Sequence, residues 1–315
     1  MGLAKNTGKT VALAALLREL EEQGRRVGVT SVGRDGEARD VIDRRIEKPS
    51  IVLAAGSLVA TTDSLLRASG RAHELVEQTG IRTPLGQVLI ARLTEPGAIE
   101  VAGPSAAADI RAVSDAMLAY GAERVLIDGA IDRRAASSPA VSDGLIMSTG
   151  AVLSEDIEEV VAKTKAAVDL VRLPRAPGTN GPDTIVLPPR FALTCEEPQI
   201  GALLDAHPST SRLITGGALP GHFLDALARA AHRRRRALTV VAEDPTKVFL
   251  TDRGPSWYGD NNIDIQVAQT VVLATITVNP VAPQSHRFDT ARLQALLRDA
   301  ITGVPIFDIR EPSPR

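Results

Sequence analysis

Residues 2–10 of the chain read GLAKNTGKT, and residues 10–23 continue as TVALAALLRELEEQ. In the longer stretch, apolar side chains recur at the spacing of one helix face, and Gly24 ends the run. The sequence therefore predicts a glycine-containing loop that leads directly into an amphipathic helix. Gly8, Lys9 and Thr10 stand at the junction between the two.

This junction contains the parts of a phosphate-binding loop. Such a loop uses backbone N–H groups at a helix N-terminus, a glycine where a side chain would clash, a Lys for the outer phosphates and a hydroxyl for Mg²⁺. Lys9 supplies the cation and is a candidate catalytic group, and Thr10 supplies the hydroxyl for Mg²⁺. The alternative is a chance Gly-Lys-Thr at a helix start. The candidate nucleotide-binding residues of the loop are Ala4, Lys5, Asn6, Thr7, Gly8, Lys9, Thr10 and Val11.

The loop departs from the common spacing of such motifs. Five residues separate Gly2 from Gly8, where the usual number is four, and Leu3 occupies the usual first-glycine position. The longer spacing resembles that of the dethiobiotin synthetase and cobyric acid synthase branch of P-loop proteins, whose loops bind ATP. The same resemblance makes Asn279 the counterpart of an Asn that reads adenine. The cofactors that it implies are ATP and Mg²⁺.

A P-loop joins a central β-strand to its helix, but in this sequence only Met1 precedes Gly2. We therefore expect several apolar residues upstream of Met1 in the natural protein. Without them the sheet would have an open slot at its centre, and backbone N–H and C=O groups of both neighbouring strands would face it.

Acidic residues follow two of the strands that the sequence predicts. Asp128 ends the apolar run Val125–Ile127 and is a candidate catalytic residue and Mg²⁺ ligand, because P-loop ATPases hold Mg²⁺ or orient a nucleophile with a carboxylate at a strand end. Asp35 and Glu37 follow the strand expected over 26–32, and Asp35 is a further catalytic candidate. Ordinary turn chemistry explains such acidic residues equally well.

Strands and helices alternate along the chain, which predicts an α/β fold in which helices cover both faces of a mostly parallel sheet. Among the helices we expect one over Leu65–Gln78. The segment 173–189 is rich in Pro and Gly and has no helical period, so we expect a linker there. This gives a P-loop nucleotide-binding domain over 1–172 and a second α/β domain over 190–315.

The composition excludes several classes of protein. The 36 Lys and Arg nearly balance the 38 Asp and Glu, so no field of the whole chain favours nucleic acid or an anionic membrane. The basic run His232–Arg236 closes an expected helix, where cations favour the helix dipole. No apolar stretch is long enough to span a bilayer. With the single cysteine Cys195 and no leader pattern, we expect a cytoplasmic protein without a zinc site.

Ordered matches along nearly the whole chain carry a closer resemblance. They are residues 2–10, TSVGRDGE at 30–37, VLIDGAIDRR at 125–134, LIMSTGAVLSEDI at 145–157, VNPVAP at 278–283 and HRFDTARL at 286–293. With these motifs the sequence resembles the reactivase subunit of lysine 5,6-aminomutase, an accessory P-loop ATPase. The resemblance implies an ATP-driven chaperone that exchanges damaged cobalamin on an adenosylcobalamin-dependent aminomutase, together with a second ATPase subunit. A homodimer is a further expected assembly.

Two other functions stay open at this point. One is an ATP-dependent ligase or kinase of the dethiobiotin synthetase type that acts on a small carboxylic acid. The other is a nucleotide-binding assembly module that does not hydrolyse ATP.

Overall fold

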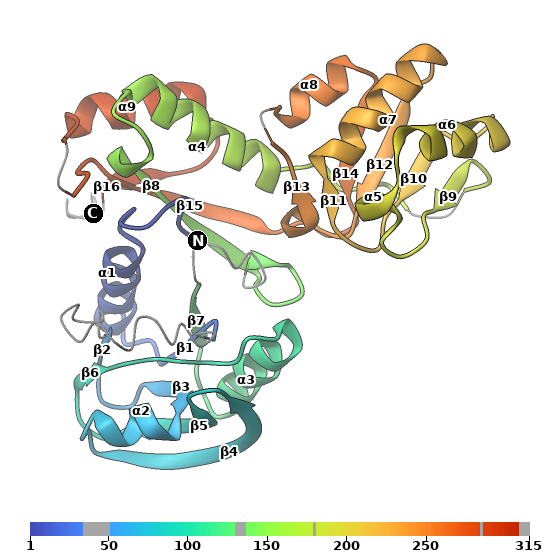
Figure 1. Cartoon of the computed structure of the whole chain (residues 1–315). Helices are drawn as coiled ribbons and strands as arrows, with labels where there is room; N and C mark the ends of the chain where they lie inside the picture. The colour runs from blue at the N-terminus through green and yellow to red at the C-terminus, as the bar shows by residue number, and fades with distance from the viewer. Residues whose placement is uncertain (34–50, 130–136, 179–180, 252, 284–285, 309–315) are drawn as a thin grey trace.

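The computed structural model describes residues 1–33, 51–129, 137–178, 181–251, 253–283 and 286–308 (Figure 1). Its fold is α/β: parallel and mixed sheets are covered by helices on both sides, as the alternation of elements in the sequence predicts. Asp35, Glu37 and the pair Arg133 and Arg134 lie outside the described residues.

A five-stranded mixed sheet holds the residues that follow the N-terminal helix α1 (Lys9–Glu22). The strand order is β4 (His73–Thr83), β5 (Gly86–Leu93), β3 (Leu58–Thr62), β1 (Val27–Ser31) and β7 (Arg124–Asp128). β1 pairs in parallel with β3 and β7, whereas β5 pairs antiparallel with β3 and β4.

Helices pack on both faces of this sheet because its strands are apolar on both sides. Leu17 of α1 packs with Val27 and Val29 of β1, while Met117 of α3 (Ala107–Ala119) lies against Gly28 between them. The short helix α2 (Asp63–Ala68) adds Leu66 to the α1 side. A two-stranded antiparallel pair, β2 (Ile51–Leu53) and β6 (Gly97–Ile99), borders the same side.

The prediction of a helix over Leu65–Gln78 is wrong beyond Ala68. α2 ends at Ala68, Gly70 takes a positive φ of 62°, and β4 begins at His73. β4 then forms a hairpin with β5, so its backbone groups pair across the strands and not within a helix. β4 lies at the edge of the sheet with exposed side chains, so little burial marks it in the sequence.

A three-stranded parallel sheet has the order β16 (Ile306–Asp308), β15 (Val272–Asn279), β8 (Gly144–Gly150). Its core includes Val160 of α4 (Ile157–Val171) and Leu293 of α9 (Thr290–Ala300). On the other edge of β8, Gly2 forms a parallel bridge with Ser148. The first residues of the chain therefore extend this sheet.

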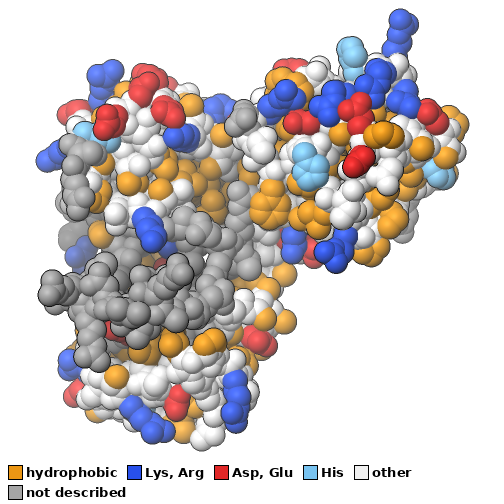
Figure 2. Space-filling model, in the orientation of Figure 1, with side chains coloured by type: hydrophobic (Ala, Val, Ile, Leu, Met, Phe, Trp, Pro, Cys, Tyr) orange, Lys and Arg blue, Asp and Glu red, His pale blue; other side chains and the backbone are white. Residues whose placement is uncertain are grey.

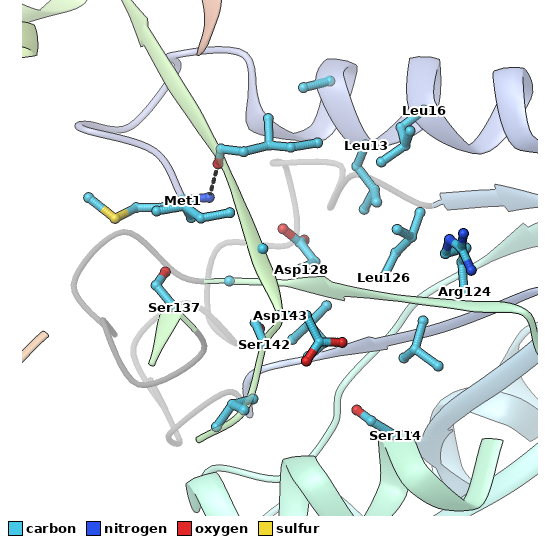
Figure 3. A pocket seen from close by; sticks show the side chains of 18 of the residues that line it. Met1, Leu13, Leu16, Ser114, Arg124, Leu126, Asp128, Ser137, Ser142 and Asp143 are labelled. Carbon is cyan, nitrogen blue, oxygen red and sulfur yellow. Dashed lines mark hydrogen bonds between the residues drawn. The ribbon is translucent and has the colours of Figure 1, made fainter. Parts of the chain in front are cut away.

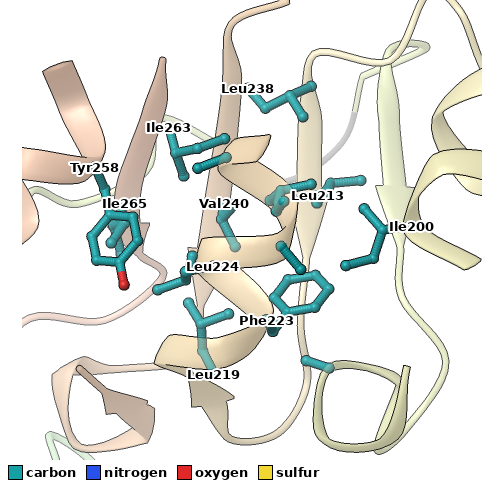
Figure 4. Packing of buried hydrophobic residues seen from close by; sticks show 14 of the residues in the cluster. Ile200, Leu213, Leu219, Phe223, Leu224, Leu238, Val240, Tyr258, Ile263 and Ile265 are labelled. Atoms are coloured by element: carbon teal, nitrogen blue, oxygen red, sulfur yellow. The ribbon is translucent and has the colours of Figure 1, made fainter. Parts of the chain in front are cut away.

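A four-stranded parallel sheet lies between β8 and β15 in the sequence and has its own core. Phe223 of α7 is 1% exposed and packs with Leu213, Val240 and Ile265 of three of these strands (Figure 4). The strand order is β14 (Ile263–Val267), β12 (Leu238–Ala242), β10 (Arg212–Ile214), β9 (Thr184–Val186). Its other elements are α5 (Phe191–Thr194), α6 (Glu197–Ala206), α7 (Gly221–Arg233), α8 (Pro255–Asp260) and the pair β11 (Leu219–Pro220) and β13 (Val248–Phe249).

The sheets do not divide the chain at the expected linker. The segment 173–189 contains β9, which pairs with β10, and β15 and β16 return to pair with β8. Residues 272–308 therefore complete the sheet that residues 144–150 begin.

Carboxylates of α6 pair with part of the basic run at the end of α7 and with Arg229 of the same helix. Arg234 pairs with Asp205 at 2.7 Å, and Arg229 and Arg233 contact Glu197. Figure 2 shows Lys and Arg side chains mixed with acidic ones over this part of the surface. Within the described ranges, no helix has the length and apolarity to cross a membrane.

Candidate functional site

The candidate loop is held in the conformation that its glycine permits. Gly8 has a φ of 88°, in the left-handed region where a side chain is unfavourable, and α1 begins at the next residue, Lys9. No side chain of the described residues caps this helix, and its first turn has no acidic residue. Within the described part of the chain, neither a side-chain cap nor a first-turn carboxylate therefore occupies the N-terminal N–H groups of α1 at the positive end of its dipole.

Two hydrogen bonds hold the loop, one between two of its own residues and one from a residue of β15. The Thr7 hydroxyl is buried and donates to the Ala4 carbonyl at 3.1 Å. The Asn279 side-chain amide donates to the Asn6 carbonyl at 2.8 Å. Asn279 ends β15, so the structure brings a residue from late in the chain to the loop. In this position it supports the loop backbone.

Lys9 and Asp128 line the same cavity, of about 650 Å³, between α1 and β7. The Lys9 ammonium donates to the carbonyl of Gly129, directly after Asp128, the last residue of β7. Asp128 is half-buried and lies opposite Ser31 of β1. The structure thus places the expected cation and the expected carboxylate beside the loop, at the carboxyl ends of parallel strands, where ligands of α/β proteins bind.

The remaining loop candidates are accessible. Lys5 and Asn6 are exposed, Thr10 is half-buried on the first turn of α1, and Val11 is 50% exposed. Ala4 is also half-buried.

The α-amino group of Met1 is a site residue that sequence reasoning missed. It donates to the Ile146 carbonyl at 2.7 Å, beside the sidechain of Asp128 (Figure 3). Burial, followed by the charge of Lys9, lowers the pKa of this amino group to about 6, and Asp128 opposes the shift. Nothing in the local sequence signals this contact, because it depends on how residues 1–3 lie along β8.

Asp244 is a second residue that the sequence did not single out. It is 2% exposed, and its carboxylate accepts from the Ser138 hydroxyl at 2.9 Å and from the Thr246 backbone N–H at 2.7 Å. It follows the apolar strand β12, which is the same pattern that singled out Asp128. The bond to Ser138 ties the segment after β12 to the segment before β8.

Among the residues that are described, no three His, Cys, Asp or Glu side chains group as ligands for a metal ion. Cys195 is buried, and burial raises its pKa, which suits an unreactive thiol.

No protein-family model, no curated protein and no solved structure matches this chain.

Proposed function

We propose that the protein is an ATP-binding, Mg²⁺-dependent P-loop NTPase. The observation that carries this proposal is the meeting of three features at one place: the uncapped N-terminus of α1 behind Gly8, the Lys9 ammonium, and the Asp128 carboxylate at the end of β7. N–H groups, an ammonium and a carboxylate are the set that holds a nucleotide phosphate with its metal ion.

Each residue has a role in this proposal. Without a ligand, the Lys9 ammonium donates to the neutral Gly129 carbonyl. When a nucleotide binds, the ammonium donates to a charged phosphate oxygen instead, which makes a stronger hydrogen bond. Thr10 and Asp128 offer the oxygen donors that Mg²⁺ prefers. Asn279 holds the loop through the Asn6 carbonyl. The bound nucleotide supplies a phosphoanhydride whose cleavage can drive a change of conformation.

The partner belongs to the proposal as well. The resemblance to the aminomutase reactivase subunit supports an ATP-driven chaperone that acts on an adenosylcobalamin-dependent aminomutase with a second ATPase subunit. The test of this part is ATP turnover with and without the aminomutase: we expect slow basal turnover that rises when the mutase is added. A rate of ATP turnover that does not change when the aminomutase is added would contradict the reactivase role but not the NTPase proposal.

A second cavity favours the ligase or kinase alternative. It has a volume of about 520 Å³ and is lined by Leu3 at the start of the loop, Leu170 of α4, and Phe249 and Arg253 of the segment around β13. The cavity is largely apolar, and Arg253, which pairs with Asp225 at 3.0 Å, is the guanidinium at its wall that a small carboxylic acid would contact. Rapid turnover that depends on such an acid, without any protein partner, would select this function.

Calorimetric titration with Mg-ATP, Mg-GTP and metal-free ATP tests the nucleotide site. We expect Lys9→Ala to weaken binding by roughly 10-fold to 100-fold, the value of one charged hydrogen bond of about 1.5–3 kcal/mol. Thr10→Ala should chiefly reduce the advantage of Mg-ATP over metal-free ATP. The matched control is Lys165→Ala, because Lys165 pairs with Asp169 on the exposed surface of α4. Equal affinity in the Lys9 variant and its control would refute the assignment.

A further inference from the structure

The cavity of about 650 Å³ described above separates two sheets along their adjacent edges, and we call it the central cavity. β7 forms one wall and β8 the other, while α1 and α3 close the two faces (Figure 3). Protein interiors pack closely and hold few voids larger than a water molecule. The central cavity is far larger than a single water. Its size needs an explanation.

The residues of β7 that line the central cavity are apolar, as in a buried strand, but they are only half-buried. β7 contains the run Val125, Leu126, Ile127, which is typical of a strand covered on both faces, yet all three are only half-buried. Its neighbour β1 is buried at every position. On α3, Leu118 lines the cavity and is 45% exposed. These apolar side chains face the central cavity.

The backbone of both walls is set up for pairing. The Val32 N–H donates to the Asp128 carbonyl at 2.9 Å, so Asp128 faces β1, and by alternation Val125 and Ile127 direct their N–H and C=O groups toward the central cavity. β7 is the last strand in its sheet among the described elements. Among the described elements, no strand pairs with this edge of β7 or with the facing edge of β8 ahead of Ile146. Two open strand edges that face each other are a usual acceptor for a further strand.

Residues 1–3 already begin such a strand. The Ser148 N–H donates to the Met1 carbonyl at 2.8 Å, and the Leu3 N–H donates to the Ser148 carbonyl at 3.0 Å. The bridge between Gly2 and Ser148 is parallel. Followed toward the N-terminus, the same ladder passes Ile146 and reaches Gly144, and both of these residues line the central cavity.

The Met1 amino group is an independent sign that the ladder continues. The Met1 nitrogen donates to the Ile146 carbonyl at 2.7 Å, at the place where the backbone N–H of a parallel strand would donate. An amide N–H at Met1 would make the same hydrogen bond and continue the ladder.

We propose that the central cavity is a strand-binding slot whose occupant is a parallel β-strand directly upstream of Met1. By the length of β7, the strand has about five residues, with a rise of about 3.3 Å each. Its side chains alternate between Leu13 and Leu16 of α1 on one face and Ser114 and Leu118 of α3 on the other. The expected sequence is therefore an apolar, β-branched run with its larger side chains on the α1 face.

The test compares two N-terminal extensions of the 315-residue chain. One adds Met-Val-Ile-Val-Val-Ala before Met1, and the matched control adds Met-Ser-Gly-Ser-Gly-Ser. We expect the apolar extension alone to raise the urea unfolding midpoint and to slow amide hydrogen exchange at Val125, Ile127 and Ile146 by tenfold or more. Equal midpoints and equal exchange in the two extended chains would overturn the proposal.

Two further arms keep the test decisive. If the chain with the apolar extension aggregates, an extension with Thr on the α3 face replaces it. A Pro at the residue before Met1 should abolish part of the rise in the urea unfolding midpoint, because Pro has no N–H to donate. Intact-mass measurement of the protein made from its native gene gives the natural N-terminus, and a start at Met1 would refute the proposed occupant. None of these readouts uses a nucleotide, so this inference and the proposed function can fail separately.

Discussion

In the 315-residue chain without an N-terminal extension, the amino group of Met1 predicts a pH dependence of folding. In the unfolded chain this group has a pKa near 8.0, and in the folded protein the pKa is about 6. Below pH 6 the amine is protonated in both states, so the folded state bears the whole penalty of a buried ammonium. Above pH 8 it is neutral in both, and the penalty is gone. The free energy of unfolding therefore rises as the pH increases from about 6 to 8.

The size of the effect follows from the shift in pKa. One pKa unit corresponds to 1.36 kcal/mol, so a shift of two units gives roughly 3 kcal/mol. The charged groups that face the amine are Lys9 on α1, which lowers its pKa, and Asp128 on β7, which raises it. We therefore expect Asp128→Asn to lower the pKa of the amine further and to deepen the loss of stability at low pH.

Urea unfolding from pH 5.5 to 8.5 measures this effect when the chain is compared with its Nα-acetylated form. Acetylation removes the titrating amine and leaves every other titrating group in place, so the difference between the two chains isolates Met1. We expect the acetylated chain to be more stable by up to about 3 kcal/mol at pH 6 and to lose this advantage by pH 8. A difference that does not vary with pH would refute the reasoning.

Two pairs of substitutions test the packing. A Cβ at Gly103 would lie 2.1 Å from the Ser31 carbonyl oxygen, whereas a Cβ at Gly216 would meet nothing within 4 Å. In thermal unfolding, Gly103→Ala should therefore lower stability by roughly 1–3 kcal/mol, and Gly216→Ala should change it little. Phe223 is 1% exposed and Phe249 is 45% exposed. Phe223→Ala should therefore cost about 3–5 kcal/mol in urea unfolding and Phe249→Ala much less, and equal losses would contradict the core that contains Phe223.

The fold class was predictable because local patterns are strong where burial is two-sided. The helix α1 and the strands β1 and β7 lie where their apolar spacing predicts them. The hairpin of β4 and β5 was not predictable in the same way. β4 is an edge strand with exposed side chains, so its pairing with β5 decides its conformation and its sequence period does not.

The candidate site shows the same division. Its local part, the loop from Ala4 to Thr10, follows from spacing and glycine position alone. Its distant part does not: Asn279 reaches the Asn6 carbonyl only because β15 pairs with β8, and that pairing spans an intervening sheet of four strands. The sequence named Asn279 through a family resemblance, and the structure gives it a contact with the backbone of the loop. The position of Asp35 lies outside the described residues.

One short segment, residues 1–9, connects the central cavity to the candidate phosphate loop. Residues 1–3 lie along β8, the loop follows, and α1 begins at Lys9, whose ammonium reaches the Gly129 carbonyl at the rim of the central cavity. A strand in the slot would hold the loop at Met1, and α1 holds it at Lys9. The loop between these two residues would therefore lose conformational freedom before a ligand binds. Preorganisation of this kind strengthens binding without a new contact to the ligand. The strand would therefore stabilise the sheet and, through the proposed nucleotide loop, raise the affinity for phosphate.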